Sequence, residues 1–369
     1  MRVVMFYHSL VSDWNHGNAH FLRGVASELK ERGFDVRVFE PRDGWSRSNL
    51  VRDAGEAALT SFSRAYPDLR SELYSSADLD VDAALEGADL VLVHEWNDPD
   101  VVARIGAHHA RHGSYRLLFH DTHHRSVTSP DEMGAFDLRH YDGVLAFGDR
   151  IRELYVERRW ARHAWTWHEA ADTRVFQPRL PASGETGDLV WIGNWGDEER
   201  SEAIERFLLR PAAALGLRAA VYGVRYPEAA IARLAAHGVE YRGWVANVDV
   251  PEVLARFRVT VHIPRRPYLE SLPGVPTIRV FEALACGIPL ITAQWNQAGD
   301  LFEPNVDFLV ARSAGEMTSH LAALLGDERR RLALARRGRE TVLRRHTCAH
   351  RVDELLAICS AIPQEAAVS

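Results

Sequence analysis

The chain has 369 residues, which suits two globular domains of ordinary size better than one. Hydrophobic residues make up 46% and charged residues 26%, an ordinary soluble composition, and the formal net charge of -7 argues against nucleic acid as a partner. No apolar run approaches the roughly 20 residues of a membrane span. The three cysteines, Cys286, Cys348 and Cys359, lack metal-ligand spacing and favour reduced thiols, so we expect a cytoplasmic protein, with peripheral membrane contact left open.

In the first half of the chain, segments with strand and helix patterns alternate. Residues 2–40 have the pattern of a strand, a helix over 19–32 and a second strand, a unit that implies a parallel sheet. Further strands are expected over 88–96, 115–124 and 142–149. Because parallel strands end at one edge of their sheet, we expect the polar residues 15–17, 95–97 and 120–125 to line one crevice there.

A second run of the same kind occupies the carboxyl-terminal half. It follows a joint at 164–178 and a segment, 179–188, whose Pro, Gly and Ser content is typical of a linker. Strands are expected over 188–195, 218–226, 239–245, 259–264 and 289–293, with helices over 199–215, 227–238 and 250–257 between them. Strands that alternate with helices predict a parallel sheet. The fold class is therefore α/β, with two Rossmann-like domains.

The segment before the last of these strands has a distinctive pattern. Four prolines and one glycine make its first half a rigid loop. They are Pro264, Pro267, Pro273, Gly274 and Pro276. From Thr277 onward apolar residues recur at helical spacing, which predicts a helix of about three turns with Thr277 as its N-cap and Gly287 and Pro289 after its end.

The start of this predicted helix has the properties of an anion site. Its first N–H groups lack partners within the helix and carry roughly half a positive charge. Arg265, Arg266 and Arg279 flank it, and Glu282 lies one turn inside. The cations suit a diphosphate, whereas the carboxylate suits sugar hydroxyls.

The run TIRVFEALACGIPLIT, residues 277–292, resembles the nucleotide-sugar motif of the group 1 glycosyltransferases, and more closely its version in the CgeB-like (spore-maturation-protein-like) glycosyltransferases. The joint at 164–178 resembles the signature that closes the first domain in that group. The resemblance implies the GT-B fold, in which two Rossmann-like domains face each other across a cleft. Residues 1–177 would form the acceptor domain and 188–350 the donor domain, and 351–369 the terminal helix that crosses back to the first domain and the tail.

The resemblance also implies roles for single residues. Glu282 would hold the ribose hydroxyls of the donor, and the helix start at Thr277 its diphosphate. A glutamate of the family that touches the donor sugar is replaced here by Gly274, so either Glu270 or backbone groups take its place, or the sugar is held differently. In the glycine loop that follows residue 192, Arg200 is the surviving cation, and Asn194 stands where the family often has arginine.

The sequence HDTHH, residues 120–124, offers a further candidate site. Its residues could be a metal site, but they follow a strand and lack helical same-face spacing, so we expect no metal. The resemblance instead implies a histidine against the donor sugar or acceptor, which matches His120, with Asp121 or His123 as alternatives. Gly17, after the first strand, resembles the glycine loop that faces donor and acceptor.

Taken together, the resemblance implies a glycosyltransferase of the hexosyltransferase type. It would move a sugar from a nucleoside-diphosphate sugar, linked to UDP, GDP, ADP or dTDP, to a hydroxyl-bearing acceptor, with retention and without metal or cofactor. Two alternatives stay open, a nucleotide-sugar epimerase on the same fold and a catalytically inactive nucleotide-sugar-binding module. Incubation with donor but no acceptor distinguishes the three functions. A transferase would hydrolyse or transfer the sugar, an epimerase would isomerise the donor, and a binding module would only bind it.

Overall fold

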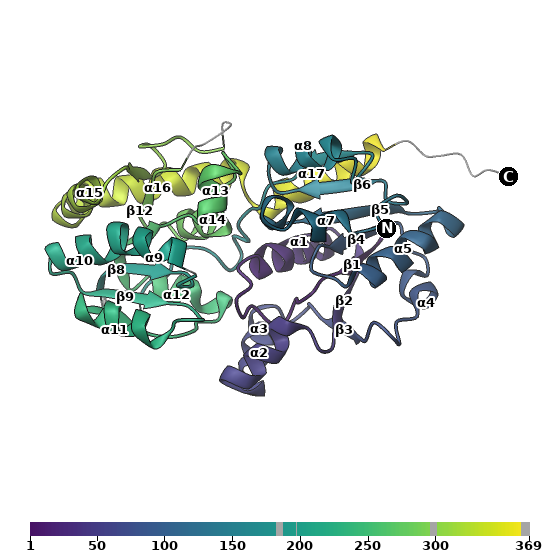
Figure 1. Cartoon of the computed structure of the whole chain (residues 1–369), viewed down its shortest axis with the longest axis horizontal. Coiled ribbons are helices and arrows are strands. Elements are labelled where there is room, and N and C mark those ends of the chain that lie inside the picture. The colour runs from purple at the N-terminus through teal and green to yellow at the C-terminus, as the bar shows by residue number, and fades with distance from the viewer. Residues whose placement is uncertain (182–186, 197, 296–300, 363–369) are drawn as a thin grey trace. The chain divides into compact units, whose positions relative to one another are not determined.

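The structure is a computed structural model that describes residues 1–181, 187–196, 198–295 and 301–362. The chain divides into two compact units (Figure 1). Unit 1 comprises Met1–Glu169 and the chain from Cys348 onward, and unit 2 comprises Ala170–Thr347. These limits differ by a few residues from the expected domain ends at 177 and 350.

Unit 1 contains one parallel sheet. Its strands are β1 (Arg2–Phe6), β2 (Asp35–Pro41), β3 (Ser71–Tyr74), β4 (Leu90–His94), β5 (Arg116–Asp121), β6 (Gly143–Ala146) and β7 (Ala164–Thr166). Among the described residues they lie in the order β3-β2-β1-β4-β5-β6-β7. All residues of β4 and nearly all of β5 are buried, which requires cover on both faces of the sheet. Crossover helices between successive strands supply that cover.

The helices of unit 1 include one from the far end of the chain. They are α1 (Ala19–Glu31), α2 (Trp45–Ala54), α3 (Thr60–Ala65), α4 (Val81–Leu85), α5 (Pro99–His112), α6 (Arg125–Thr128), α7 (Pro130–Gly134), α8 (Asp149–Glu157) and α17 (Cys348–Ala361), with a 3₁₀ turn at Glu56–Leu59. Helix α17, yellow in Figure 1, packs on α1, and the indole N–H of Trp167 donates to the carbonyl of Arg351. The expected return of the terminal helix to the first domain is confirmed.

Unit 2 contains the second parallel sheet. Its strands are β8 (Gly187–Ile192), β9 (Ala219–Tyr222), β10 (Val239–Tyr241), β11 (Phe257–His262), β12 (Leu290–Ala293) and β13 (Leu309–Ala311). Within the described part of the chain the order is β10-β9-β8-β11-β12-β13. In both sheets the strand order reverses direction between the unit's first and fourth strands. Ligands of open parallel sheets bind at the carboxyl ends of the strands beside such a reversal.

The helices of unit 2 connect these strands and end the unit. They are α9 (Glu198–Ile204), α10 (Arg210–Ala214), α11 (Glu228–Ala236), α12 (Val250–Leu254), α13 (Arg266–Glu270), α14 (Ile278–Ala285), α15 (Ala314–Gly326) and α16 (Glu328–Arg345), with a π turn at Glu205–Leu209 and a 3₁₀ turn at Asn247–Asp249. The single helix expected over 199–215 is interrupted by that π turn. Pro211 lacks an N–H, and its ring disfavours regular α-helical bonding to the preceding turn. No helix among the described residues has the length and apolar character needed to cross a membrane.

Candidate functional site

His262, the last residue of β11, lies at the point where the strand order of unit 2 reverses. Its Nδ1 lies 2.9 Å from Thr292 Oγ1 and its Nε2 lies 3.0 Å from Thr277 Oγ1. Because the Thr292 hydroxyl already donates to the carbonyl of Ala293, it accepts from His262 Nδ1–H, and Thr277 donates to Nε2. Burial lowers the pKa of His262 to about 3, so the ring is neutral.

The hydrogen bond between Thr277 and His262 changes the role expected for Thr277 as a helix cap. The residue occupies the N-cap position of α14, but its side chain makes no cap bond. The expected cap is thus wrong in its contact: the Thr277 hydroxyl bonds to His262 and accepts no hydrogen bond from the backbone N–H groups of α14. The start of α14 consequently has no side-chain acceptor from Thr277, and its positive end stays available to an anion. The helix has 8 residues, which is shorter than the three turns expected.

Arg200 reaches the same strand end. Its Nη2 donates to the carbonyl of Ile263 at 2.7 Å, and its guanidinium lies 5.1 Å from the ring centroid of Trp191. Gly196 adopts a φ of +79°, and a Cβ there would come within 3.2 Å of the Arg200 side chain. The charge of Arg200 also lowers the pKa of His262. The structure therefore brings Arg200, His262 and the start of α14 together.

Glu282 lies inside unit 2 and is 1% exposed. Its Oε1 accepts from Asn247 Nδ2 at 2.9 Å, and its Oε2 pairs with Arg279 Nη1. A cavity of about 20 Å³ adjoins it, which is room for roughly one water molecule. The cavity is lined by Ile192, Val250, Leu254, Thr260, Val261, His262, Arg279, Glu282, Ala283 and Leu290. A ligand hydroxyl at Glu282 Oε2 would therefore compete with Arg279.

The loop before α14 explains the missing glutamate at Gly274. Gly274 adopts a φ of +82°, a left-handed conformation that residues other than glycine rarely take.

Arg265 is half-buried at the N-cap position of α13. Arg266 is exposed and lies 3.9 Å from the carboxylate of Glu270. Glu270 is thus at the surface, on the same short helix as Arg266.

The loops that follow β8 and β9 are bonded to each other. Asn194 Oδ1 accepts from the backbone N–H of Val224 at 3.0 Å, and the Tyr226 hydroxyl donates to the carbonyl of Gly193 at 2.7 Å. A Cβ at Gly223 would lie 2.2 Å from the carbonyl oxygen of Gly193, so only glycine allows this approach. Asn194 therefore joins two loops through a neutral amide, at a position where the family often has a charge.

In unit 1, His120 is fully buried on β5. Its ring lies among those of Phe21, His94 and Trp167, with centroid distances of 6.0, 5.5 and 4.8 Å. Neither ring nitrogen has a hydrogen-bond partner among the residues that the structure describes, and burial lowers the pKa of His120 to about 3. The structure thus places this candidate catalytic residue as a neutral imidazole in an aromatic environment.

Asp121 is likewise buried and bonded within unit 1. Its Oδ2 accepts from the Tyr155 hydroxyl at 2.9 Å, and its Oδ1 accepts from the backbone N–H of His123 at 3.0 Å. Burial, and next the charge of Glu95, raise the pKa of Asp121 well above its usual range. These bonds fix the course of the chain after β5.

The loops at the carboxyl edge of unit 1 meet, as the parallel sheet predicts. Arg125 Nη2 lies 2.7 Å from Glu95 Oε2, and its guanidinium lies 3.9 Å from the ring centroid of Trp96. Asn18, which adjoins Gly17, donates from Nδ2 to the carbonyl of Thr122 at 3.1 Å. Gly17 is therefore close to the end of β5, although no contact of its own identifies a ligand.

This edge also holds a set of buried imidazoles that we call the histidine cluster: His8, His16 and His94. His16 belongs to the expected crevice residues 15–17, whereas sequence reasoning missed His8 and His94. The His8 ring lies 4.1 Å from that of His16, 5.8 Å from that of His94 and 5.5 Å from the Trp45 ring, on which it stacks. Burial lowers the pKa of His8 to about 3 and those of the other two well below the usual value. His8 follows β1 and His94 ends β4. Both could have been found from the expectation that polar residues at the carboxyl ends of parallel strands line one crevice.

Comparison with known proteins found one family model and a number of solved structures that are similar to this chain. Residues 200–357 match the family model described as glycosyl transferase-like. No curated protein matches the chain. The solved structures that match include an alpha-glucosyltransferase in complex with UDP and DNA (TM-score 0.70, 14% identity, 98% of this chain and 99% of that one).

Two other solved structures also match over nearly the whole length of both chains. Anabaena HepE in complex with UDP and glucose has a TM-score of 0.66 at 13% identity, over 98% of this chain and 100% of that one. Sucrose-phosphate synthase from Thermosynechococcus elongatus has a TM-score of 0.64 at 15% identity, over 97% and 98%. The fold is that of the GT-B glycosyltransferases, with two parallel-sheet α/β domains, as the sequence predicts.

Proposed function

We propose that the chain is a glycosyltransferase that moves a sugar from a UDP-sugar to a hydroxyl acceptor. The observation that carries the proposal is the convergence of Arg200, His262 and the start of α14 at the strand reversal of unit 2. Nearly all of this arrangement lies in the segment that matches the glycosyl transferase-like family. UDP is favoured as the carrier because structures with the same fold are described in complex with it.

The chemistry would depend on stabilising the departing diphosphate. As the bond between sugar and phosphate breaks, negative charge grows on the leaving oxygen while the sugar becomes cationic. A fixed guanidinium and the N–H groups of a helix start stabilise that charge without reorganising at the moment of reaction. Arg200 and α14 would supply both, which is why we propose transfer without a metal ion. Retention of configuration is part of the proposal through the resemblance to group 1 enzymes.

Glu282 and Arg279 would change partners when the donor binds. In the structure the carboxylate of Glu282 pairs with Arg279, whose side chain is 31% exposed. A ribose hydroxyl that donates to Glu282 would free the guanidinium of Arg279 for the diphosphate. The exchange leaves neither charge buried alone, so its cost would be small compared with that of breaking the pair outright.

The acceptor would bind at the carboxyl edge of unit 1. There the half-buried Trp45, Trp96 and His123 lie beside the histidine cluster. These flat, neutral groups suit an uncharged ring, such as the apolar face of a sugar, better than an anion. The exclusion of nucleic acid, which rests on net charge, stays a prediction, and three similar structures of an alpha-glucosyltransferase are described in complex with DNA.

The experiment is a turnover assay with each nucleotide sugar, first alone and then with a panel of sugar, lipid-linked sugar and DNA acceptors. Release of UDP that accelerates with one acceptor class, together with a mass increase of one sugar on that acceptor, is the expected result. An isomerised donor, or tight binding without turnover for any donor and acceptor pair, would contradict the proposal.

A further inference from the structure

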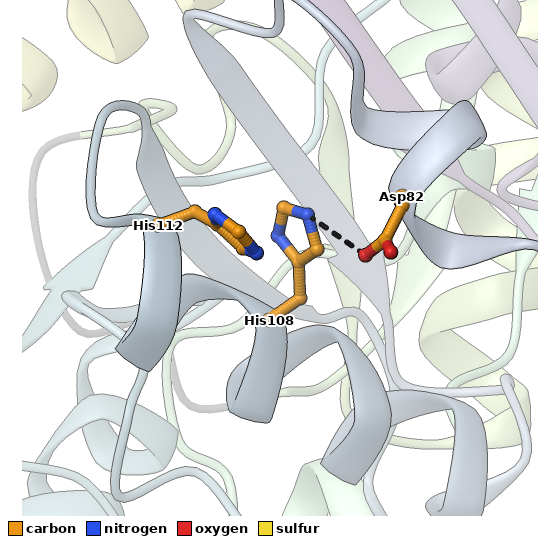
Figure 2. A group of neighbouring side chains, drawn as sticks. All are labelled: Asp82, His108 and His112. Carbon is orange, nitrogen blue, oxygen red and sulfur yellow. Dashed lines mark ion pairs between the residues drawn. The ribbon is translucent and has the colours of Figure 1, made fainter.

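A second cluster of chemically active side chains lies in unit 1, away from the carboxyl edge of the sheet. Among the described residues, the ligand atoms of Asp82, His108 and His112 lie within 4.8 Å of one another. His108 and His112 come from α5 and Asp82 from α4, and Figure 2 shows the three side chains gathered beside one another. Nothing in the proposed transfer reaction uses them.

The spacing of these residues suits a metal ion. Histidines four residues apart lie on one face of a helix, so α5 presents both imidazoles to the same side. His108 Nε2 lies 3.5 Å from Asp82 Oδ1. Ligand atoms that bind a tetrahedral zinc ion at about 2.0–2.1 Å lie roughly 3.3–3.4 Å apart, so this pair is already at the separation that zinc requires.

The surroundings of His108 also fix its ring. The residue is buried, and its Nδ1 lies 2.9 Å from the Tyr115 hydroxyl. A ring nitrogen held by such a partner leaves the other nitrogen directed at the metal, which is the usual arrangement around zinc. His112 and Asp82 are exposed, so both can adjust to the ion, and a fourth position would stay open to water.

We propose that Asp82, His108 and His112 form a binding site for a divalent transition-metal ion of the zinc type, which ties α4 to the last turn of α5. Two imidazoles and one carboxylate favour zinc, nickel or copper over magnesium or calcium. A cation there also meets the negative end of the α5 dipole, since His112 is the last residue of the helix.

The position of the proposed metal site in the fold indicates a stabilising role. Helix α5 starts after the carboxyl end of β4 and returns to the amino end of β5. The cluster in its last turn is thus separated from the carboxyl edge by the 6 residues of β5, a length of roughly 20 Å. An ion there would hold two crossover helices together without touching the reacting groups.

The test uses the intact, untagged chain, treated with chelator and then desalted. Calorimetry with ZnCl₂ should show one site, and saturating zinc should raise the melting temperature of unit 1 by about 5 °C. Asp82→Asn and His112→Ala change exposed side chains and should each weaken zinc binding at least about tenfold and abolish the shift. His140→Ala, an exposed histidine of the same unit outside the cluster, is the matched control and should keep both.

Three results would overturn the proposal. They are the absence of zinc binding to the wild-type chain, unchanged affinity in both cluster variants, and a magnesium affinity equal to that for zinc. None of these measurements involves turnover, so they test the zinc site independently of the proposed transferase activity.

Discussion

The two sheets share one strand order, yet their carboxyl edges differ in charge. At the edge of unit 2, arginines and an uncapped helix start surround the neutral His262. At the edge of unit 1, the guanidinium of Arg125 is paired with the buried Glu95 and that of Arg23 with Asp13, and the imidazoles are neutral. The same topology thus builds one edge suited to an anion and another suited to an uncharged molecule, and the residues after each strand make the difference.

The largest expected effect follows from removing the cation of unit 2. Arg200→Gln should lower kcat/KM about 10²–10³-fold, since a preorganised group that stabilises leaving-group charge has an effect of that size. Arg336→Ala, a change at an exposed arginine of α16, is the control and should leave turnover unchanged. Equal kcat/KM for Arg200→Gln and wild type, with unchanged melting temperatures, would show that the charge of unit 2 has no part in the reaction.

A smaller effect is expected at Glu282. Glu282→Gln keeps the shape of the side chain but removes the charge that pairs with Arg279 and would bind the ribose. A charge-assisted hydrogen bond contributes about 1.5–3 kcal/mol, so UDP affinity should fall about tenfold or more in calorimetry. Glu252→Gln, on the exposed surface of α12, serves as control. Unchanged affinity would remove Glu282 from the donor site, and a large loss of stability would make it a structural residue.

Acid should lower the stability of unit 1 more than that of unit 2. Buried histidines whose pKa lies near 3 or well below the usual value stay neutral in the folded chain but bind protons in the unfolded chain below pH 6.5. The free energy of unfolding therefore falls as pH drops from about 6.5 toward the folded pKa, by up to about 1.4 kcal/mol per pH unit for each histidine, and is unaffected above that range.

Among the described residues, unit 1 has more of these histidines than unit 2, so it should open first. Hydrogen exchange at pH 7 and pH 5 should show that peptides of β4 and β5 lose protection sooner than peptides of β11 and β12. Equal loss in both units, or greater loss in unit 2, would mean that the imidazoles of unit 1 are hydrated or charged.

The smallest expected effect is that of a chelator. Turnover should be unchanged by EDTA, because arginines and a helix start take the place of a metal at the diphosphate. A chelator should act only on stability, through the cluster of Asp82, His108 and His112. Activity that is lost with EDTA and restored by Mn²⁺ would contradict transfer without a metal.

Much of the fold could be predicted because buried parallel strands are apolar throughout. β4 and β5 are recognisable in the sequence for that reason. β3 was missed because it lies at the end of the sheet, where only one of its four residues is buried. β13, with 3 residues, was also missed.

The site could be predicted only as far as residue type and strand ends allow. The arginines and Glu282 were recognised from their positions around a helix start. Their partners were not, because the pairing of Glu282 with Asn247 joins residues 35 positions apart. In the same way, His262 accepts a hydrogen bond from the hydroxyl of Thr277, 15 positions away, a contact that no local pattern reports.

The most direct test of the account is hydrogen exchange on the intact chain with and without saturating UDP. The nucleotide should protect the backbone amides at the start of α14 and in the loops after β8 and β11, and leave those after β4 and β5 unchanged. Protection confined to the carboxyl edge of unit 1, or no protection anywhere at saturating UDP, would contradict the claim that unit 2 binds the donor.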